Sequence, residues 1–187
     1  MDIYEKYAYS ENAKAAIDML EGRRSVRMFK DTQVPMDIVE KICEAGTYAA
    51  SGMNKQPSTI LVIQNPDTIA ELEKINAKVI GDPAAHPFYG APTLLVVLSD
   101  PEVSYTYLED GTLVLGNLMN AAHALGVDSC WIHRAKQEFE TEFGKELLKK
   151  HGLSESLVGI GNLILGYRDC EYPNVRPRKD NYVVICE

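Results

Sequence analysis

Arginine is the residue whose placement most directly suggests chemistry in this chain. Of 187 residues only seven are arginine, and five of these fall in two short stretches near opposite ends of the chain. They are Arg23, Arg24, Arg27, Arg176 and Arg178. A guanidinium group binds phosphate through two parallel hydrogen bonds, and the hydroxyl of Ser25 would add a donor. Because the net charge is −8, the clustering suggests a local anion site, with two solvated loops as the equally weighted alternative.

Two further stretches carry polar groups at notable spacings. Residues 50–57 read ASGMNKQP, and their amides and hydroxyls could hydrogen-bond the edge of a heteroaromatic ring. An ordinary Asn/Gly turn has the same composition and would be preferred if this stretch stood alone. Cys130 and His133 have the spacing of a metal or nucleophile pair, but no second ligand pair accompanies them. Core packing of Cys130 is favoured, and no metal site is predicted.

Composition excludes several classes of protein. The chain is 45% hydrophobic and 25% charged, which is average for a globular domain. Its acidic balance argues against nucleic-acid binding, which depends on neutralising phosphates. No apolar run approaches the roughly 20 residues of a membrane helix, and the N-terminus has acids and tyrosines where a secretory signal would be basic and then apolar. We therefore expect a soluble, cytoplasmic protein with neither a nucleic-acid nor a membrane partner.

Hydrophobic periodicity indicates the elements that must position these residues. Apolar residues at helical spacing mark helices around 13–20, 35–45, 69–75, 105–125 and 139–150. Short runs rich in β-branched residues predict strands at 59–64, 93–99, 130–132, 157–166 and 182–186. The helix at 105–125 has apolar or small residues on more than one side, as a central helix would. Helices and strands interleave without a linker, so we expect one α+β domain over residues 1–187, with a three-layer plan.

The usual nucleotide-binding motifs are absent. There is no G-x-x-x-x-G-K-[ST] sequence, and the glycines of residues 159–166 lie in a predicted strand with the wrong spacing for a dinucleotide fingerprint. Arginines would therefore have to hold any phosphate group.

Six stretches, taken together and in order, resemble the nitroreductase family of FMN-dependent oxidoreductases. The resemblance covers nearly the whole chain and rests on RRSVRMF, ASGMNKQPSTILVI, GAPTLLVVL, AAHALGVDSCWIHR, GIGNLILGY and VRPRK. It implies a three-layer α/β/α fold with a central, mostly antiparallel sheet and a long central helix. It also implies a homodimer, in which an extended C-terminal arm at about 167–187 embraces the partner subunit.

The resemblance further implies a noncovalent FMN site at each subunit interface. The phosphate and ribityl contacts match Arg23, Arg24 and Ser25, and the C-terminal pair that returns to the phosphate matches Arg176 and Arg178. The cation near the flavin N1/O2 edge matches Arg27, where positive charge would stabilise the reduced, anionic flavin. The loop that reaches the flavin from the partner subunit matches Ser51, Met53, Asn54 and Gln56.

The remaining matches concern the isoalloxazine ring. Trp131 and Ile132 correspond to residues that pack near the ring, and His133 and Arg134 fall where backbone amides approach N5 and O4. Two positions depart from the family pattern. Ser58 stands where many relatives have tryptophan, and the short stretch 81–90 replaces a helical excursion that contacts the flavin pyrimidine, so that contact is left unassigned.

The implied activity is hydride transfer from NAD(P)H, through flavin N5, to nitroaromatic, quinone or related small acceptors. The flavin carries this chemistry, so no catalytic side chain is assigned. A reductive dehalogenase or a flavin reductase on the same scaffold is an alternative enzyme. A low-turnover flavin-binding or regulatory protein, or an anion-binding module without flavin, is an alternative from another class.

Overall fold

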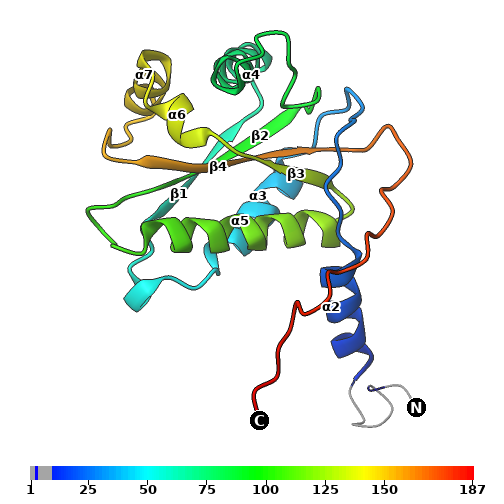
Figure 1. The fold of residues 1–187 in the computed structure, drawn as a ribbon. Helices are drawn as coiled ribbons and strands as arrows, with labels where there is room; N and C mark the ends of the chain where they lie inside the picture. The colour runs from blue at the N-terminus through cyan, green and yellow to red at the C-terminus, as the bar shows by residue number, and fades with distance from the viewer. Residues whose placement is uncertain (1–2, 4–9) are drawn as a thin grey trace.

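Four antiparallel strands form one sheet at the centre of the protein (Figure 1). The computed structural model describes residue 3 and residues 10–187. The strands lie in the order β1 (Ser58–Ile63), β2 (Thr93–Ser99), β4 (Val158–Gly166) and β3 (Asp128–Ile132). Every residue of β2 is buried, as its unbroken apolar run predicts for a strand covered on both faces.

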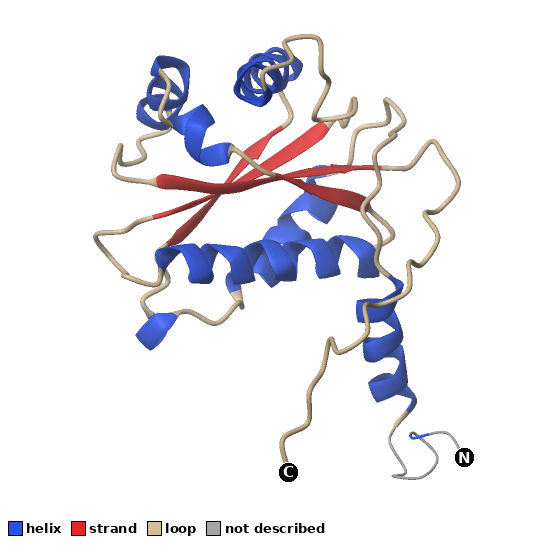
Figure 2. Ribbon diagram, viewed as in Figure 1, coloured by secondary structure: helices blue, strands red, loops and turns tan. Residues whose placement is uncertain are grey.

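Helices cover both faces of this sheet (Figures 1 and 2). One face carries α4 (Pro66–Ile80), α6 (Ala135–Phe139) and α7 (Glu142–Lys150), and the other carries α3 (Met36–Thr47) and the long helix α5 (Tyr107–Ala124). The three-layer arrangement, the antiparallel sheet and the long central helix confirm the expected α+β fold.

Alternation along the strands divides the core between the two faces. On β2, Leu94, Val96 and Leu98 pack with the cluster under α4, α6 and α7. Leu95 and Val97 pack with the cluster that includes α3 and α5. Successive side chains of a strand point to opposite faces, so a single apolar strand supplies both halves of the core.

Local capping chemistry sets the helix ends and corrects one expectation. The side chain of Asn65 accepts a hydrogen bond from Thr68 N at 2.9 Å, and Gly81 ends α4 with a φ of 86°. The single helix predicted at 139–150 is wrong, because the chain forms α6 and α7 with a break between them. At that break Thr141 Oγ1 accepts from Gly144 N at 3.2 Å and starts a new helix.

Both ends of the described chain project away from the sheet (Figure 1). Helix α2 (Glu11–Gly22) has no buried residue, and the segment after Gly166 is irregular. The terminal strand predicted at 182–186 is wrong, since these residues are not in a strand and Ile185 is 80% exposed. A β-pattern forms a strand only beside a partner strand, and this segment has none among the residues that the structure describes. Over the described part of the chain, no helix combines the length and apolarity needed to span a membrane.

Candidate functional site

The first arginine motif runs alongside β3. Ser25 and Ser129 form a parallel β-bridge, and Val26 N donates to Ser129 O at 3.0 Å. Val26 is fully buried and anchors this segment, which leads from α2 towards α3. Two residues further along the two segments, Arg27 and Trp131 line one cavity.

Arg23 and Arg24 are half-buried and incompletely paired. Arg24 Nη1 donates to Glu21 O at 2.6 Å and to Arg23 O at 2.7 Å, and Arg24 N donates to the Tyr172 hydroxyl at 2.9 Å. Three buried polar atoms in this neighbourhood have no hydrogen-bond partner: Arg23 Nη1, Arg24 Nε and Ser129 Oγ. An unpaired buried donor costs about 1–3 kcal/mol, so the two guanidinium nitrogens fit an anionic ligand.

The last turn of α5 lies beside the arginine motif. The ring of His123 stacks on that of Tyr172, with centroids 6.1 Å apart. Burial, and then the charges of Arg23 and other nearby arginines, lower the pKa of His123 below its ordinary value. Tyr172 also donates to Gly22 O at 3.1 Å, so its hydroxyl joins the beginning of the arm to the arginine motif.

A cavity of about 340 Å³ brings the first motif together with the residues at and after the end of β3. Its lining includes five of the predicted site residues: Arg27, Trp131, Ile132, His133 and Arg134. The remaining wall comes from Ile80, Ala85, His86, Pro87 and Tyr89. The stretch 81–90 therefore contributes to this site, at the position where the family resemblance left a flavin contact unassigned.

The turn at the end of β3 has an unusual backbone. Arg134 is the N-cap of α6 and has a φ of 82°, in the left-handed region that non-glycine residues rarely adopt. A hydrogen bond from Asn76 Nδ2 to His133 O, 2.9 Å long, holds the turn from α4. Such strained residues persist where the surrounding structure fixes them, which is common at functional sites.

The second motif forms a separate loop around the turn η1 (Gly52–Asn54). Met53, Asn54 and Gln56 all have positive φ, and Gln56 N donates to Ser51 Oγ at 3.0 Å. Ser51 and Gln56 line a smaller cavity of about 140 Å³. The Met53 side chain is 75% exposed.

Helix α5 separates the second motif from the first. Gly52 N donates to Asp110 Oδ1 at 2.9 Å in the first turn of α5, whereas Gly22, just before the arginine motif, lies beside His123 in its last turn. The separation of 13 positions between Asp110 and His123 corresponds to about 20 Å of helix. Figure 1 shows the two motifs at opposite ends of α5. A single chain therefore does not bring them together.

The C-terminal arginines lie at the surface of the chain. Arg176 and Arg178 are exposed, and Arg178 Nη2 donates to the carbonyl of Arg176 at 2.8 Å. The expected return of Arg176 and Arg178 to the phosphate bound by Arg23 and Arg24 stays a prediction.

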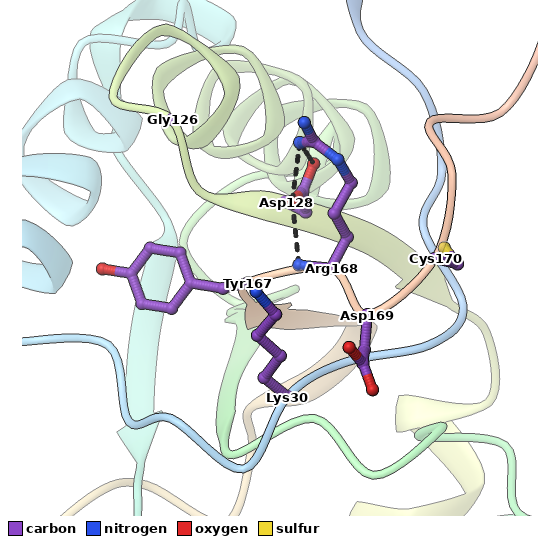
Figure 3. A pocket seen from close by; sticks show the side chains of 7 residues that line it. All are labelled: Lys30, Gly126, Asp128, Tyr167, Arg168, Asp169 and Cys170. Atoms are coloured by element: carbon purple, nitrogen blue, oxygen red, sulfur yellow. Dashed lines mark hydrogen bonds and ion pairs between the residues drawn. The ribbon is translucent and has the colours of Figure 1, made fainter.

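A larger cavity, about 420 Å³, lies beside the predicted site (Figure 3). Figure 3 shows Arg168, just after β4, reaching to Asp128, with a distance of 3.2 Å from Nη1 to Oδ2. Arg168 N also donates to Asp128 Oδ2 at 3.0 Å. These contacts join the end of β4 to the start of β3, so the Arg168 charge is already compensated.

Comparison with known proteins identifies the class of protein. Residues 20–167 match the family model of the nitroreductase family. An Archaeoglobus fulgidus protein, provisionally named NADH dehydrogenase/NAD(P)H nitroreductase, is 29% identical over 155 residues, covering 81% of this chain and 84% of that protein. The crystal structure of a nitroreductase with bound FMN from Bacteroides fragilis has a TM-score of 0.83 at 26% identity, covering 92% of this chain and 98% of that chain.

A third relative has a different named activity. An iodotyrosine deiodinase of Haliscomenobacter hydrossis is 28% identical over 140 residues, covering 58% of this chain and 62% of that protein. Fold and matches together define an oxidoreductase. This chain belongs to the nitroreductase family, as its sequence motifs predict.

Proposed function

We propose that this chain binds FMN noncovalently and transfers hydride from NAD(P)H to small acceptors such as nitroaromatics and quinones. The observation that carries the proposal is that one short segment has both unpartnered buried donors and a residue that lines a cavity. Residues 23 and 24 hold buried guanidinium nitrogens without partners, and Arg27 lines a cavity together with the residues after β3. The FMN bound by the Bacteroides fragilis nitroreductase supports the same cofactor here.

The phosphate end of FMN fits the arginine motif. Arg23 Nη1 and Arg24 Nε are donors without protein acceptors, and Ser25 adjoins them in sequence. Charge-assisted hydrogen bonds to a phosphate would satisfy these donors and offset the desolvation of the phosphate. Arg176 and Arg178 would add positive charge to this end in the assembled protein.

The ring end of FMN fits the cavity beside β3. Trp131 and Ile132 supply apolar surface, and Arg27 supplies a positive charge that favours the reduced form of a flavin. Neither His133 N nor Arg134 N donates to an acceptor among the described residues, so both amides are free to meet acceptor atoms of a ligand. When bound, FMN would supply the hydride acceptor and donor at N5, and the side chains would bind and orient it.

A second copy of the chain would complete the site. The loop of Ser51, Met53, Asn54 and Gln56 lies at the opposite end of α5 from the arginine motif, so it reaches a flavin only from another subunit. Exposed apolar side chains support such an assembly, since Val183, Val184 and Ile185 of the arm are each 78–80% exposed. We therefore propose a homodimer with FMN sites at the interface.

Removing the arginines tests the cofactor assignment. Arg23→Ala or Arg24→Ala should each weaken FMN binding about tenfold to a hundredfold, because each removes charge-assisted bonds of about 1.5–3 kcal/mol. FMN titration followed by flavin fluorescence measures this change. Lys41→Ala, which removes an exposed charge on α3, is the matched control and should leave affinity unchanged. Wild-type affinity in both arginine variants would contradict the proposal.

A second candidate activity is reductive dehalogenation, which the iodotyrosine deiodinase relative favours. Both activities would use the same flavin site and differ in the acceptor. Turnover of the FMN-loaded protein with a nitroaromatic, a quinone and an iodotyrosine separates them. We expect the nitroaromatic and the quinone to be reduced faster, and preferential loss of iodide from iodotyrosine would assign the second activity instead.

A further inference from the structure

Three buried polar side chains meet beneath the turn that follows β3. Asn76 on α4, Glu138 on α6 and Asn162 on β4 are each fully buried. Figure 1 shows α4 and α6 over the same face of the sheet that contains β4. A carboxyl group in such a position is costly unless hydrogen bonds compensate it.

Two side-chain amide groups donate hydrogen bonds to the Glu138 carboxyl from two sides. Asn162 Nδ2 lies 2.9 Å from both Oε1 and Oε2, and Asn76 Nδ2 donates to Oε1. The contact between α6 and β4 is tight as well, because a side chain at Gly159 would collide with the backbone of Ala135. The carboxyl therefore has a fixed position between the sheet and α4.

Asn76 links this carboxyl to the turn. Its Nδ2 carries two hydrogens, one directed to Glu138 and one to His133 O at 2.9 Å. Its Oδ1 accepts from Arg134 Nε at 2.9 Å. Every hydrogen-bonding group of the Asn76 side chain is thus used, and only one orientation of the amide satisfies all of them.

This orientation also sets the direction of a backbone amide. The His133 carbonyl points to Asn76, and in a trans peptide the following N–H points the opposite way. Arg134 N–H is therefore directed away from the buried cluster. Both residues line the cavity proposed to hold the flavin ring.

We propose that Glu138 is a positioning residue for the reaction proposed above: through Asn76 it fixes the His133–Arg134 peptide so that the Arg134 amide faces the ligand cavity. This inference rests on the proposed function, because the amides matter only if a flavin ring meets them. Glu138 itself touches neither cofactor nor substrate.

The protonation state of Glu138 makes this positioning role measurable. Burial raises its pKa to about 7, against the lowering effect of hydrogen bonds from Asn76 and Asn162 and the charge of Arg134. The side chains that face Glu138 from α4 and β4 are the neutral amides of Asn76 and Asn162. From α7, Gly144 packs against the Glu138 backbone, and the charged residue before α6 is Arg134. A deprotonated Glu138 holds Asn76 more firmly, because charge-assisted hydrogen bonds are stronger than neutral ones.

Two variants of Glu138 test the inference in the FMN-loaded protein. The matched control is Glu140→Gln, which changes an exposed glutamate just beyond α6. Glu138→Leu should slow flavin reduction by NAD(P)H in stopped flow about tenfold to a hundredfold, because misplaced groups cost that much. The FMN dissociation constant should change less than about threefold, since the charged phosphate end carries most of the affinity. Glu138→Gln should restore most of the rate and remove its pH dependence near neutrality.

A second readout needs no flavin. In ¹⁵N NMR of the protein without FMN, the His133 and Arg134 amide resonances should move in Glu138→Leu and stay in place in Glu140→Gln. Wild-type reduction rates or unmoved amides in Glu138→Leu would overturn the inference. If Glu138→Leu does not fold, Asn76→Ser breaks the same link, and a wild-type rate there overturns it equally. Failure of the wild type to bind FMN would instead overturn the proposed function, while the amide resonances still test the Glu138 link.

Discussion

Several buried polar atoms near the arginine motif have no hydrogen-bond partner, which folding alone does not require. Arg23 Nη1 and Arg24 Nε lie at the phosphate end of the proposed site, and Ser129 Oγ belongs to the residue that pairs with Ser25. Folding alone would favour pairing these donors with protein acceptors. The presence of Arg23 Nη1 and Arg24 Nε on one motif is therefore better explained by a ligand that supplies the acceptors.

Glu138 should make stability depend on pH in a predictable direction. Its folded pKa of about 7 lies above the ordinary 4.5, so the native state binds the proton more tightly than the unfolded chain. This stabilisation is fully present below about pH 4.5 and is lost as pH rises through about 7, which lowers the free energy of unfolding by up to about 3 kcal/mol. Urea unfolding of wild type and Glu138→Gln at several pH values measures the effect.

The comparison between these two proteins isolates Glu138 from the other titrating groups. The difference in unfolding free energy between Glu138→Gln and wild type should grow in favour of the variant as pH rises toward 8. A difference that stays constant with pH would show that Glu138 does not titrate in this way.

Residues of the site differ in how far the sequence predicts them. The arginine motif stands out because five of seven arginines are clustered. Asn76 and Asn162 have no such signal, because they are separated from Glu138 by 62 and 24 residues and lie in segments whose pattern indicates only a helix and a strand. Only the packing of α4 and α6 on the sheet brings the three together.

At the scale of elements, continuous apolar runs predict the strands well. The strand expected at 93–99 coincides with β2, and the one expected at 157–166 begins one residue before β4. Two expectations are wrong for identifiable reasons. Thr141 offers a helix cap inside a helical pattern, and the run at 182–186 lacks a neighbouring strand. Patterns report burial and propensity, whereas caps and pairing partners decide where an element ends.

The contact between β3 and β4 at Gly161 offers an element-scale test. A Cβ at Gly161 would meet the indole Nε1 of Trp131 at less than van der Waals distance. Gly161→Ala should therefore displace the indole, shift its fluorescence and destabilise the fold by about 1–3 kcal/mol, as overpacking does. Trp131 is the only tryptophan, so the emission spectrum reports on this contact alone.

Gly116 on α5 provides the matched control for that substitution. A Cβ there has no neighbouring atom within 4 Å, so Gly116→Ala should leave the fluorescence unchanged and stabilise the helix by up to about 1 kcal/mol. An unshifted spectrum and unchanged stability in Gly161→Ala would contradict the packing described between Trp131 and β4.

At the scale of the whole molecule, one chain holds at a distance the two motifs that we propose share a site. The arginine motif and the β3 turn lie at one end of α5, and the loop around Met53 lies at the other. Helix α2 buries no residue, and the arm exposes Tyr182, Val183 and Ile185 at 70–80%. The motif order in the sequence implies a shared site, which under the proposed function a second subunit would complete, and periodicity within one chain does not reveal such a partner.

Sedimentation velocity of the purified protein with added FMN, recorded at the visible flavin absorption, tests the central claim most directly. The measurement follows the cofactor and the assembly state together. The account predicts that flavin sediments with a particle of twice the 20.8 kDa chain mass, at one FMN per chain. Flavin that remains at the meniscus, or that sediments with a single chain, would contradict it.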